Sequence, residues 1–213
     1  MNVSAVAAVL VVASYLLGSV PTGLLVARAR GIDIRGVGSG NIGATNVARS
    51  LGKKLGLVVL VLDALKGATP VLLAISLGFD QPAEEIADRW VEYSASLAPW
   101  VIPAVGVAAI AGHCFPPWLR FRGGKGVATS WGVFLAVDPM MAAIATVIFA
   151  ALYAAFRLAS IASLSGALAM PTLLWLGGRD DPVVALGIVC AAIIAAKHSS
   201  NIGRLLRREE HKV

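Results

Sequence analysis

Long apolar segments separated by short polar ones run through almost the whole chain, and they constrain its fold more than any other feature. Of the 213 residues, 58% are hydrophobic and 14% are charged, and the mean hydropathy is +0.81. Soluble domains carry about 25% charged residues, and a helix needs about 20 apolar residues to cross a bilayer. The sequence therefore predicts an all-α polytopic membrane protein, with one domain over residues 1–213.

Seven apolar segments can be drawn along the chain, at about 3–27, 55–78, 94–112, 127–137, 139–156, 160–176 and 183–197. The first has no basic residue before it and continues to Ala27, which favours a retained helix over a cleaved signal peptide. The fourth covers about 17 Å at the helical rise, which is short for a hydrocarbon core of about 30 Å. We therefore expect it to begin inside the preceding loop and to depend on its neighbours.

Charge alternates from one loop to the next. Loops 28–54, 113–126, 157–159 and 197–213 hold fifteen of the eighteen Lys and Arg residues, whereas 79–93, 138 and 177–182 hold two of these and eight of the twelve acids. Because cytoplasmic loops are enriched in Lys and Arg, this pattern predicts about seven transmembrane helices, with the N-terminus outside and the C-terminus cytoplasmic. The net charge of +6 then reflects topology, and we expect no nucleic-acid partner.

The first glycine segment, residues 37–46 (VGSGNIGATN), is too polar to span a membrane. Glycines permit positive φ and close backbone approach, and the polar side chains beside them suit a phosphate-like anion. Arg49 lies on the same face as Asn46 if a helix starts there. The alternative is a flexible loop whose basic residues serve topology alone. The candidate anion-binding residues of this segment are Gly38, Ser39, Gly40, Asn41, Thr45 and Asn46.

The second glycine segment, residues 121–129 (FRGGKGVAT), follows Pro116 and Pro117, which end the third apolar segment. Its glycines let backbone amides converge, and a helix that starts after it directs its N-terminal dipole at a bound anion. We expect Thr129 to cap that helix. The alternative is a re-entrant turn with its lysine extended to lipid headgroups. The candidate residues are Gly123, Gly124, Lys125, Gly126 and Thr129.

The C-terminal polar segment, residues 197–204, follows the last apolar segment. A helical continuation places His198 and Asn201 on one face, where His198 can contact phosphate or accept a proton; the alternative is a solvated or capping histidine. Ser160 and Ser163 begin the sixth apolar segment, where small hydroxyl residues also serve helix packing. By the charge pattern these segments and both glycine segments share the cytoplasmic side, so we expect one common site there.

Asp63 and Lys66 lie within the second apolar segment and can pair, either as functional groups or as a self-neutralising pair that lines the bundle. The two cysteines, Cys114 and Cys190, and three histidines give no metal-ligand spacing. A carboxylate pair or a Ser/Cys–His–Asp triad is not evident either. We expect no metal and no cofactor. From the residues alone, an enzyme that handles phosphorylated lipids and a small permease for anions both remain open.

Residues 38–49 (GSGNIGATNVAR) resemble the first motif of the bacterial PlsY family, the acyl-phosphate-dependent glycerol-3-phosphate acyltransferases. Residues 112–129 resemble the second motif, with Cys114 and Trp118 as mild departures. Residues 198–204 resemble the third more loosely, because Ser199 and Ser200 stand where many relatives carry charged residues. Residues 63–67 and the start of the sixth apolar segment also fit, so the similarity covers essentially the whole chain.

The resemblance implies a seven-helix enzyme of the bacterial plasma (inner) membrane with its active site at the cytoplasmic face. It would transfer a fatty acyl group from acyl phosphate to the 1-hydroxyl of sn-glycerol 3-phosphate, giving lysophosphatidic acid and phosphate. Because acyl phosphate is a mixed anhydride with a good leaving group, we expect direct attack by the glycerol hydroxyl. Its partners would be these two substrates, membrane lipid and, as a candidate, the enzyme that makes acyl phosphate. By motif position the implied contacts are Ser39, Arg49, Lys125, His198, Asn201 and one of Ser160 and Ser163.

Overall fold

The computed structural model describes residues 3–81 and 98–210, and the regular structure in this part of the chain is helical throughout. This confirms the predicted all-α class. Short 3-10 turns lie at Ile34–Gly36 and Pro117–Leu119. The helices are α1 (Val3–Gly18), α2 (Thr22–Arg28), α3 (Ala44–Leu51), α4 (Lys53–Ser76), α6 (Ala98–Cys114), α7 (Val127–Val137), α8 (Pro139–Phe156), α9 (Ala159–Leu176), α10 (Asp181–Lys197) and α11 (Ser199–Leu206).

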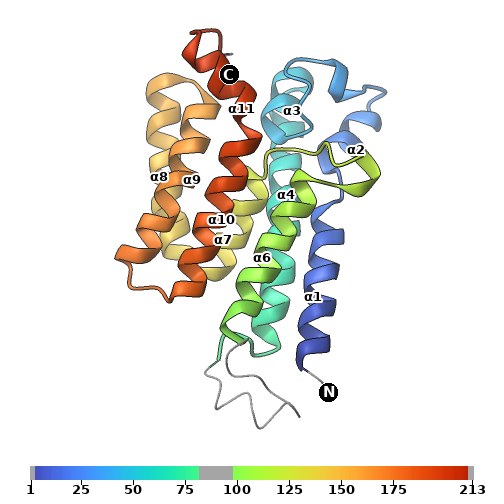
Figure 1. The fold of residues 1–213 in the computed structure, drawn as a ribbon. Coiled ribbons are helices and arrows are strands. Elements are labelled where there is room, and N and C mark those ends of the chain that lie inside the picture. Colours follow the sequence, from blue (N-terminus) through green and yellow to red (C-terminus); the bar gives the residue numbers. More distant parts are fainter. Residues whose placement is uncertain (1–2, 82–97, 211–213) are drawn as a thin grey trace.

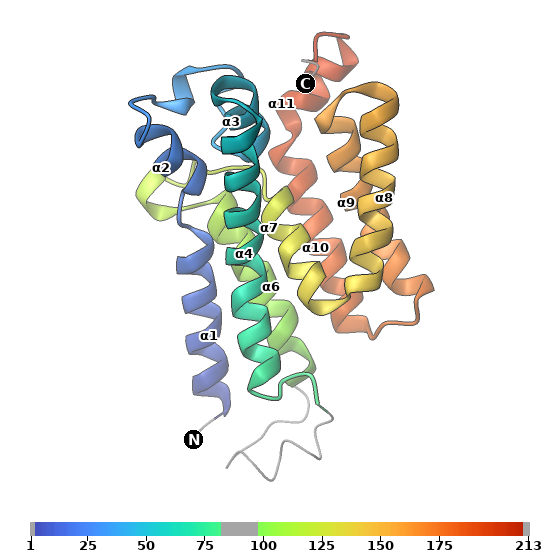
Figure 2. The ribbon, with the colours of Figure 1, turned by 180° about the vertical axis from the view of Figure 1, so that it is seen from behind.

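The long helices form an elongated bundle (Figures 1 and 2). Helices α1, α4 and α6 pack together on one side, α8, α9 and α10 on the other, and α7 lies between the two groups and contacts α4, α6 and α8. Helices α2, α3 and α11 gather at one end, whereas the described part of α1 starts at the opposite end. The glycine segments and the C-terminal polar segment thus meet at the end that carries the short helices.

Five helical stretches of the described residues are long and apolar enough to cross a membrane: 4–28, 53–76, 98–119, 139–156 and 159–176. Helices α10 and α11 together make a sixth candidate, bent by 61°. Helix α7 is the short apolar helix at residues 127–137, as predicted. Seven spans remain a prediction. Residues 94–97 of the third predicted span and five charged residues of loop 79–93 lie outside the described part: Glu84, Glu85, Asp88, Arg89 and Glu92.

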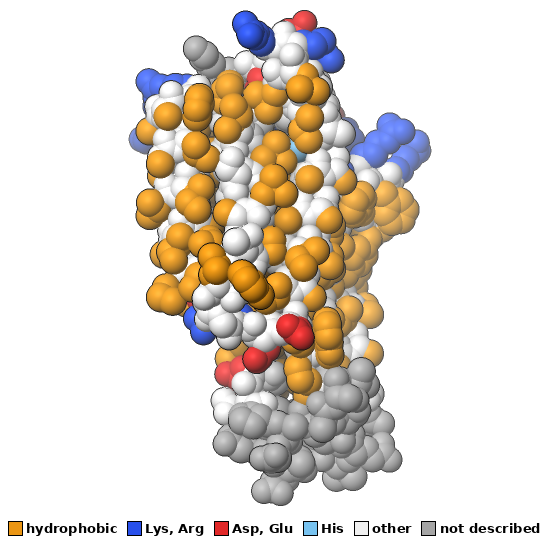
Figure 3. Space-filling view, turned by 60° about the vertical axis from the view of Figure 1, so that its left-hand side comes forward, with side chains coloured by type: hydrophobic (Ala, Val, Ile, Leu, Met, Phe, Trp, Pro, Cys, Tyr) orange, Lys and Arg blue, Asp and Glu red, His pale blue; other side chains and the backbone are white. Residues whose placement is uncertain are grey.

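Charge separates along the bundle in the same direction as in the sequence. Figure 3 shows most of the visible Lys and Arg side chains at the end that carries the C-terminal helix, whereas acidic side chains lie at both ends, with the larger group toward the other end. Between them the side of the molecule is largely hydrophobic, as expected for a surface that faces lipid. Which end faces the cytoplasm follows from the positive-inside bias and stays a prediction.

Small residues seat α7 tightly against α4. A Cβ atom on Gly67 would lie 2.1 Å from the carbonyl oxygen of Thr129, and one on Gly132 would lie 1.9 Å from that of Ala64. This backbone-to-backbone contact is typical of membrane helix pairs. The prediction that Thr129 caps α7 is wrong. The N-cap is Gly126, with φ +82°, and Thr129 is buried within the first turn of the helix.

Candidate active site

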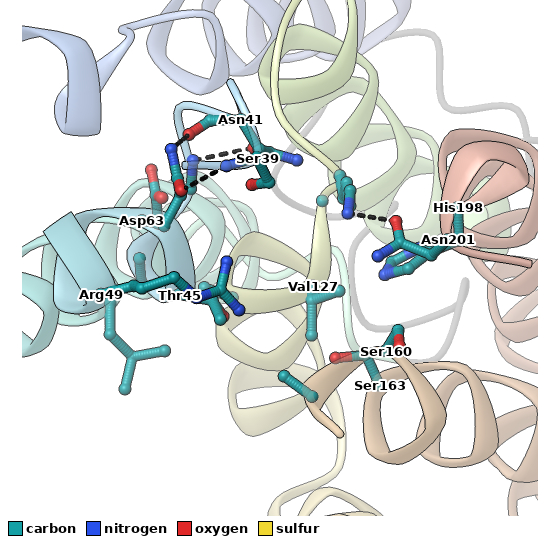
Figure 4. A pocket seen from close by; sticks show the side chains of 18 of the residues that line it. Ser39, Asn41, Thr45, Arg49, Asp63, Val127, Ser160, Ser163, His198 and Asn201 are labelled. Atoms are coloured by element: carbon teal, nitrogen blue, oxygen red, sulfur yellow. Dashed lines mark hydrogen bonds between the residues drawn. The ribbon is translucent and has the colours of Figure 1, made fainter. Parts of the chain in front are cut away.

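Three segments that lie far apart in the sequence converge around one cavity of about 140 Å³. Figure 4 shows residues of the first glycine segment and α3 on one side of this cavity and residues of α9 and of the α10–α11 bend on the other, with Val127 of α7 between them. The predicted residues that line the cavity are Ser39, Asn41, Thr45, Asn46, Arg49, Lys125, Gly126, Ser160, Ser163, His198 and Asn201. The structure therefore brings together most of the residues that the sequence singles out.

The first glycine segment is shaped by its own amide side chains. Asn46 is buried; its Nδ2 donates to the carbonyls of Val37 and Asn41, each at 2.9 Å, and its Oδ1 accepts from the Ser39 amide at 2.9 Å. Asn41 Oδ1 accepts from the Gly43 amide at 2.8 Å. These groups are used within the loop, so Asn46 acts as a scaffold although it lines the cavity. The side chains of Ser39, Thr45 and Arg49 are exposed beside it.

Gly38 and Gly40 do not line the cavity, although both were predicted contacts. Their φ angles are +61° and +70°, a region that residues with a Cβ atom rarely adopt. They make the turns that carry Ser39 to the cavity wall. Helix α3 starts at Ala44, inside the segment, and so places Arg49 one turn beyond Asn46 on the same face, the arrangement expected if a helix starts there. Gly38 and Gly40 therefore set the course of the backbone that positions Ser39.

The second glycine segment is held by the end of α6. The amides of Gly123 and Gly124 donate to the carbonyls of Cys114 and His113, both at 3.1 Å. A Cβ atom on Gly123 would lie 2.2 Å from the His113 carbonyl, and one on Gly124 would lie 2.1 Å from His113 Nε2. These two amides are therefore not available to a ligand, which corrects the prediction that they bind an anion. Gly126 lines the cavity and leads into α7, whose N-terminus faces it.

Lys125 crosses the cavity from this loop. Its half-buried ammonium donates to Oδ1 of Asn201. Burial lowers the pKa of Lys125 to about 8; Glu210 opposes this, and the positive charges of Arg204 and Arg49 add to it. Burial and, to a smaller extent, the neighbouring cations disfavour the charged ammonium, so the site favours an added negative charge.

The C-terminal polar segment does not continue as one helix, which corrects the expectation of a helical continuation. Helix α10 ends at Lys197, α11 starts at Ser199, and the two are bent by 61° with His198 between them. His198 Nδ1 lies 2.8 Å from the carbonyl oxygen of Ile194. Because a carbonyl can only accept, Nδ1 carries the hydrogen, which leaves Nε2 with a lone pair. The bend places both His198 and Asn201 in the cavity wall.

Arg204 and Glu210 line the cavity beside Asn201, and the sequence-based prediction leaves both out as contacts. Glu210 accepts from Asn201 Nδ2 at 2.6 Å and from Arg204 Nε at 2.7 Å. Burial raises the pKa of Glu210, but the hydrogen bonds from Asn201 and Arg204 outweigh it and hold that pKa below its usual range. Arg204 follows Asn201 by three residues, a spacing that places it on the same face of α11. No sequence spacing points to Glu210 in the same way, because its hydrogen bonds to Asn201 and Arg204 depend on how the C-terminal tail folds back.

A buried ionic network lies at the inner end of the cavity. Asp63 Oδ1 is 2.8 Å from Lys66 Nζ and 3.5 Å from His113 Nδ1, and it accepts a hydrogen bond from Thr22. Lys66 also donates to the Val20 carbonyl at 2.7 Å, where the chain breaks between α1 and α2. The predicted Asp63–Lys66 pair is present and is largely self-neutralised. Asp63 and His113 also line the cavity.

An apolar groove of about 300 Å³ continues from the cavity between α7, α8 and α9. It shares five lining residues with the cavity: Leu60, Val127, Ala128, Phe149 and Ser163. The remaining lining is almost entirely apolar and includes Trp131, Phe134 and Met170. A polar, cation-rich cavity that opens into an apolar groove suits an amphiphile with an anionic head.

The described residues contain no group of three or more His, Cys, Asp or Glu side chains that could hold a metal ion. Cys114 and Cys190 are free thiols and both are buried. Neither lines the cavity. The reactive groups that the cavity does present are hydroxyls, two imidazoles, amides, cations and two paired carboxylates.

A family model, individual relatives and solved structures all match this chain to glycerol-3-phosphate acyltransferases. A family model described as glycerol-3-phosphate acyltransferase matches residues 8–208. Proteins named glycerol-3-phosphate acyltransferase are similar to this chain: one from Geobacter sulfurreducens is 44% identical over 204 residues, 96% of each chain, and one from Anaeromyxobacter dehalogenans is 45% identical over 215 residues, the full length of both.

Two crystal structures of PlsY, an integral membrane glycerol 3-phosphate acyltransferase, have the same fold. The glycerol 3-phosphate form has a TM-score of 0.86 at 39% identity and covers 97% of this chain and 95% of that one. The lysophosphatidic acid form has a TM-score of 0.83 at 38% identity and covers 97% and 94%.

Proposed function

The chain belongs to the glycerol-3-phosphate acyltransferase family, and we propose that it transfers a fatty acyl group from acyl phosphate to the 1-hydroxyl of sn-glycerol 3-phosphate. The products are lysophosphatidic acid and inorganic phosphate. The observation that carries this proposal is the direct connection between a cation-rich polar cavity and an apolar groove. Such a site can hold a phosphate and an acyl chain of one reaction side by side.

The cations of the cavity match the charge of two phosphorylated substrates. Arg49, Lys125 and Arg204 approach from three different segments, and Ser39, Thr45 and Asn201 supply neutral hydrogen-bonding groups between them. Two anions repel each other, so fixed cations around both lower the cost of bringing the hydroxyl to the acyl carbon. We assign Ser39, Arg49, Lys125 and His198 to the catalytic constellation, with Ser160 and Ser163 as contacts at the entrance of the groove.

The acyl group passes in one step, without an acyl-enzyme. The 1-hydroxyl oxygen forms a bond to the acyl carbonyl carbon, the bond from that carbon to the phosphate oxygen breaks, and the phosphate leaves with the electron pair. The hydroxyl proton goes to His198 Nε2 or to a phosphate oxygen. Acyl phosphate is a mixed anhydride with a good leaving group, so positioning and charge compensation supply most of what the enzyme must add.

Among the described residues, the two thiols are the strongest nucleophiles and do not reach the cavity, which supports direct transfer. Both thiols are buried away from the cavity. The double variant Cys114→Ala, Cys190→Ala is therefore expected to keep its turnover number within about threefold of the parent. A dead but folded double variant would exclude direct transfer.

In the cell we place the protein in the bacterial inner membrane, with the cavity at the cytoplasmic face and the N-terminus outside. The concentration of Lys and Arg at the cavity end supports this orientation. Substituted-cysteine labelling of Ser39 and Lys125 in oriented vesicles tests it, because both sites should react from the cytoplasmic side. The enzyme that supplies acyl phosphate would then deliver its product to the same face.

A donor comparison tests the activity. Purified protein is given labelled glycerol 3-phosphate with palmitoyl phosphate, palmitoyl-CoA or palmitoyl acyl carrier protein as separate donors. Lysophosphatidic acid from palmitoyl phosphate alone is the expected result. Product from either of the other two donors would overturn the assigned donor, and no product from any donor with folded protein would overturn the activity.

A further inference from the structure

The apolar groove has a definite length, which bears on the acyl chains that it can hold; this inference rests on the proposed function. Along α9 the groove runs from Ser163 to Met170, about 10 Å at the helical rise. One leaflet of a bilayer is about 15 Å thick in its hydrocarbon part, half of the core. The groove thus encloses about two thirds of a membrane-length acyl chain.

The groove ends at side chains that belong to the main core. Phe134 is 3% exposed and Met170 is 5% exposed, and both pack in the core cluster with Ala145. Nearer the start of α7, Trp131 Nε1 donates a hydrogen bond to Thr146 Oγ1 at 2.9 Å, and this bond joins α7 to α8 in the groove lining. A chain longer than the groove must therefore leave it sideways for the bilayer.

Gly166 lines the groove midway, one turn from Ser163 and one turn from Met170. A Cβ atom there would meet the carbonyl oxygen of Ala145 at 3.6 Å, an ordinary van der Waals contact, and its φ is not positive. Gly67 and Gly132 differ, because a Cβ atom on either would collide with backbone. Neither packing nor backbone conformation requires glycine at 166, although glycine is disfavoured within helices.

We propose that Gly166 determines the acyl-chain specificity of this enzyme, because the missing side chain keeps the groove open to long chains. A long acyl chain that enters the groove from the bilayer moves from one apolar environment to another. The free energy of binding therefore changes little with chain length. Steric room then decides which chains react. The parent protein accepts membrane-length chains with little discrimination, and bulk at 166 converts it to short chains.

The test compares two donors of different length in the parent and in Gly166→Leu. Butyryl phosphate is too short to pass residue 166, which lies about 5 Å beyond Ser163 along the helix, whereas palmitoyl phosphate must pass it. We expect kcat/KM for palmitoyl phosphate to fall at least tenfold in Gly166→Leu and that for butyryl phosphate to stay within threefold. Gly166→Ala adds one methyl group that fits the observed space, so its palmitoyl-to-butyryl ratio should fall less than that of Gly166→Leu.

Leu168→Phe is the matched control, because it adds bulk to the same helix at a side chain that is 57% exposed and does not line the groove. Its donor ratio should equal that of the parent. If Gly166→Leu lowers the melting temperature, Gly166→Val carries the same test with less bulk. An unchanged palmitoyl-to-butyryl ratio in the folded 166 variants overturns this inference alone, whereas loss of all activity in the parent overturns the proposed function.

Discussion

The two glycine segments look alike in sequence, but they are held in different ways. The first is shaped from within: Asn46 and Asn41 side chains bond its backbone, and Gly38 and Gly40 supply positive φ. The second is shaped from outside, because the amides of Gly123 and Gly124 pair with the end of α6 and no room is left for a Cβ atom. The positive φ is the main reason for glycine at 38 and 40, although a Cβ atom on Gly38 would also lie 2.4 Å from Asn46 Oδ1, whereas at 123 and 124 the reason is proximity alone.

The largest effect is expected where proximity to backbone is required. In Gly123→Ala the new Cβ atom would lie 2.2 Å from the His113 carbonyl, which cannot move without shifting α6. The loop that carries Lys125 must then retreat, and a displacement of about 1 Å in a positioning group can cost 100-fold in rate. We expect kcat/KM to fall about 100-fold or more, measured with palmitoyl phosphate and glycerol 3-phosphate.

Gly36→Ala provides the control for this prediction. A Cβ atom at Gly36 has nothing within 4 Å, and its φ is not positive, so its kinetics should match those of the parent. Near-parental activity in Gly123→Ala would show that the second segment tolerates a wider gap from α6 than the structure has.

The next largest effect concerns the internal scaffold of the first segment. Asn46→Ala removes the donor to the Val37 and Asn41 carbonyls and the acceptor for the Ser39 amide. Each lost bond in a buried loop costs about 1 kcal/mol, so we expect about 2–3 kcal/mol of destabilisation and a roughly tenfold fall in kcat/KM through misplaced Ser39. Thermal unfolding in detergent and steady-state kinetics measure the two effects.

Thr45→Ala separates scaffold from contact, because Thr45 lines the cavity without a hydrogen bond that holds the loop. It should lower activity with little change in melting temperature. If Asn46→Ala behaved in the same way, with activity lost and stability kept, Asn46 would be a substrate contact and not a scaffold.

A smaller, graded effect is expected from pH. Lys125 has its pKa lowered to about 8, mainly by burial, so its ammonium is present below that pH and is lost as the pH rises through it. A phosphomonoester has its second pKa near 6, so its charge is constant above about pH 7.5. KM for glycerol 3-phosphate should therefore rise between pH 7.5 and 9.5, by about fivefold overall, because Arg49 and Arg204 also line the cavity and share the binding of the substrate.

Lys125→Arg tests this assignment, because a guanidinium stays charged throughout that range. Its basal activity is expected to be lower, since a planar guanidinium differs in shape from an ammonium, but its KM for glycerol 3-phosphate should vary little with pH. A parent KM that is flat from pH 7.5 to 9.5 would contradict a role for the Lys125 charge in binding.

The sequence predicts the helices well because apolar length and loop charge are local properties. The short α7, the Asp63–Lys66 pair and the placement of Ser39, Arg49, Lys125 and His198 in one cavity all follow the prediction. What it misses depends on partners far along the chain. The amides of Gly123 and Gly124 are taken by α6, and Glu210 reaches Asn201 and Arg204 through the fold of the tail.

The bend at His198 is missed for another reason. Residues 197–200 contain neither proline nor glycine, which are the usual signals for a helix break. Partly buried hydrogen bonds on both sides of the bend, from Lys125 to Asn201 and from Lys197 to the Cys114 carbonyl, hold it in place. Such tertiary contacts override local propensity.

The smallest expected effect is the change in stability that a positive φ angle causes by itself. Arg157, exposed between α8 and α9, has φ +59°, a conformation that costs a residue with a Cβ atom about 1–2 kcal/mol. Arg157→Gly should raise stability by about 1 kcal/mol or less after the entropy cost of glycine, with kinetics unchanged, whereas Arg157→Ala should gain nothing. If Arg157→Gly gave no increase in melting temperature, conformation would contribute little, and the need for glycine would rest on close approach: a Cβ atom on Gly38 would lie 2.4 Å from Asn46 Oδ1, and one on Gly40 would lie 3.0 Å from the Arg35 carbonyl oxygen.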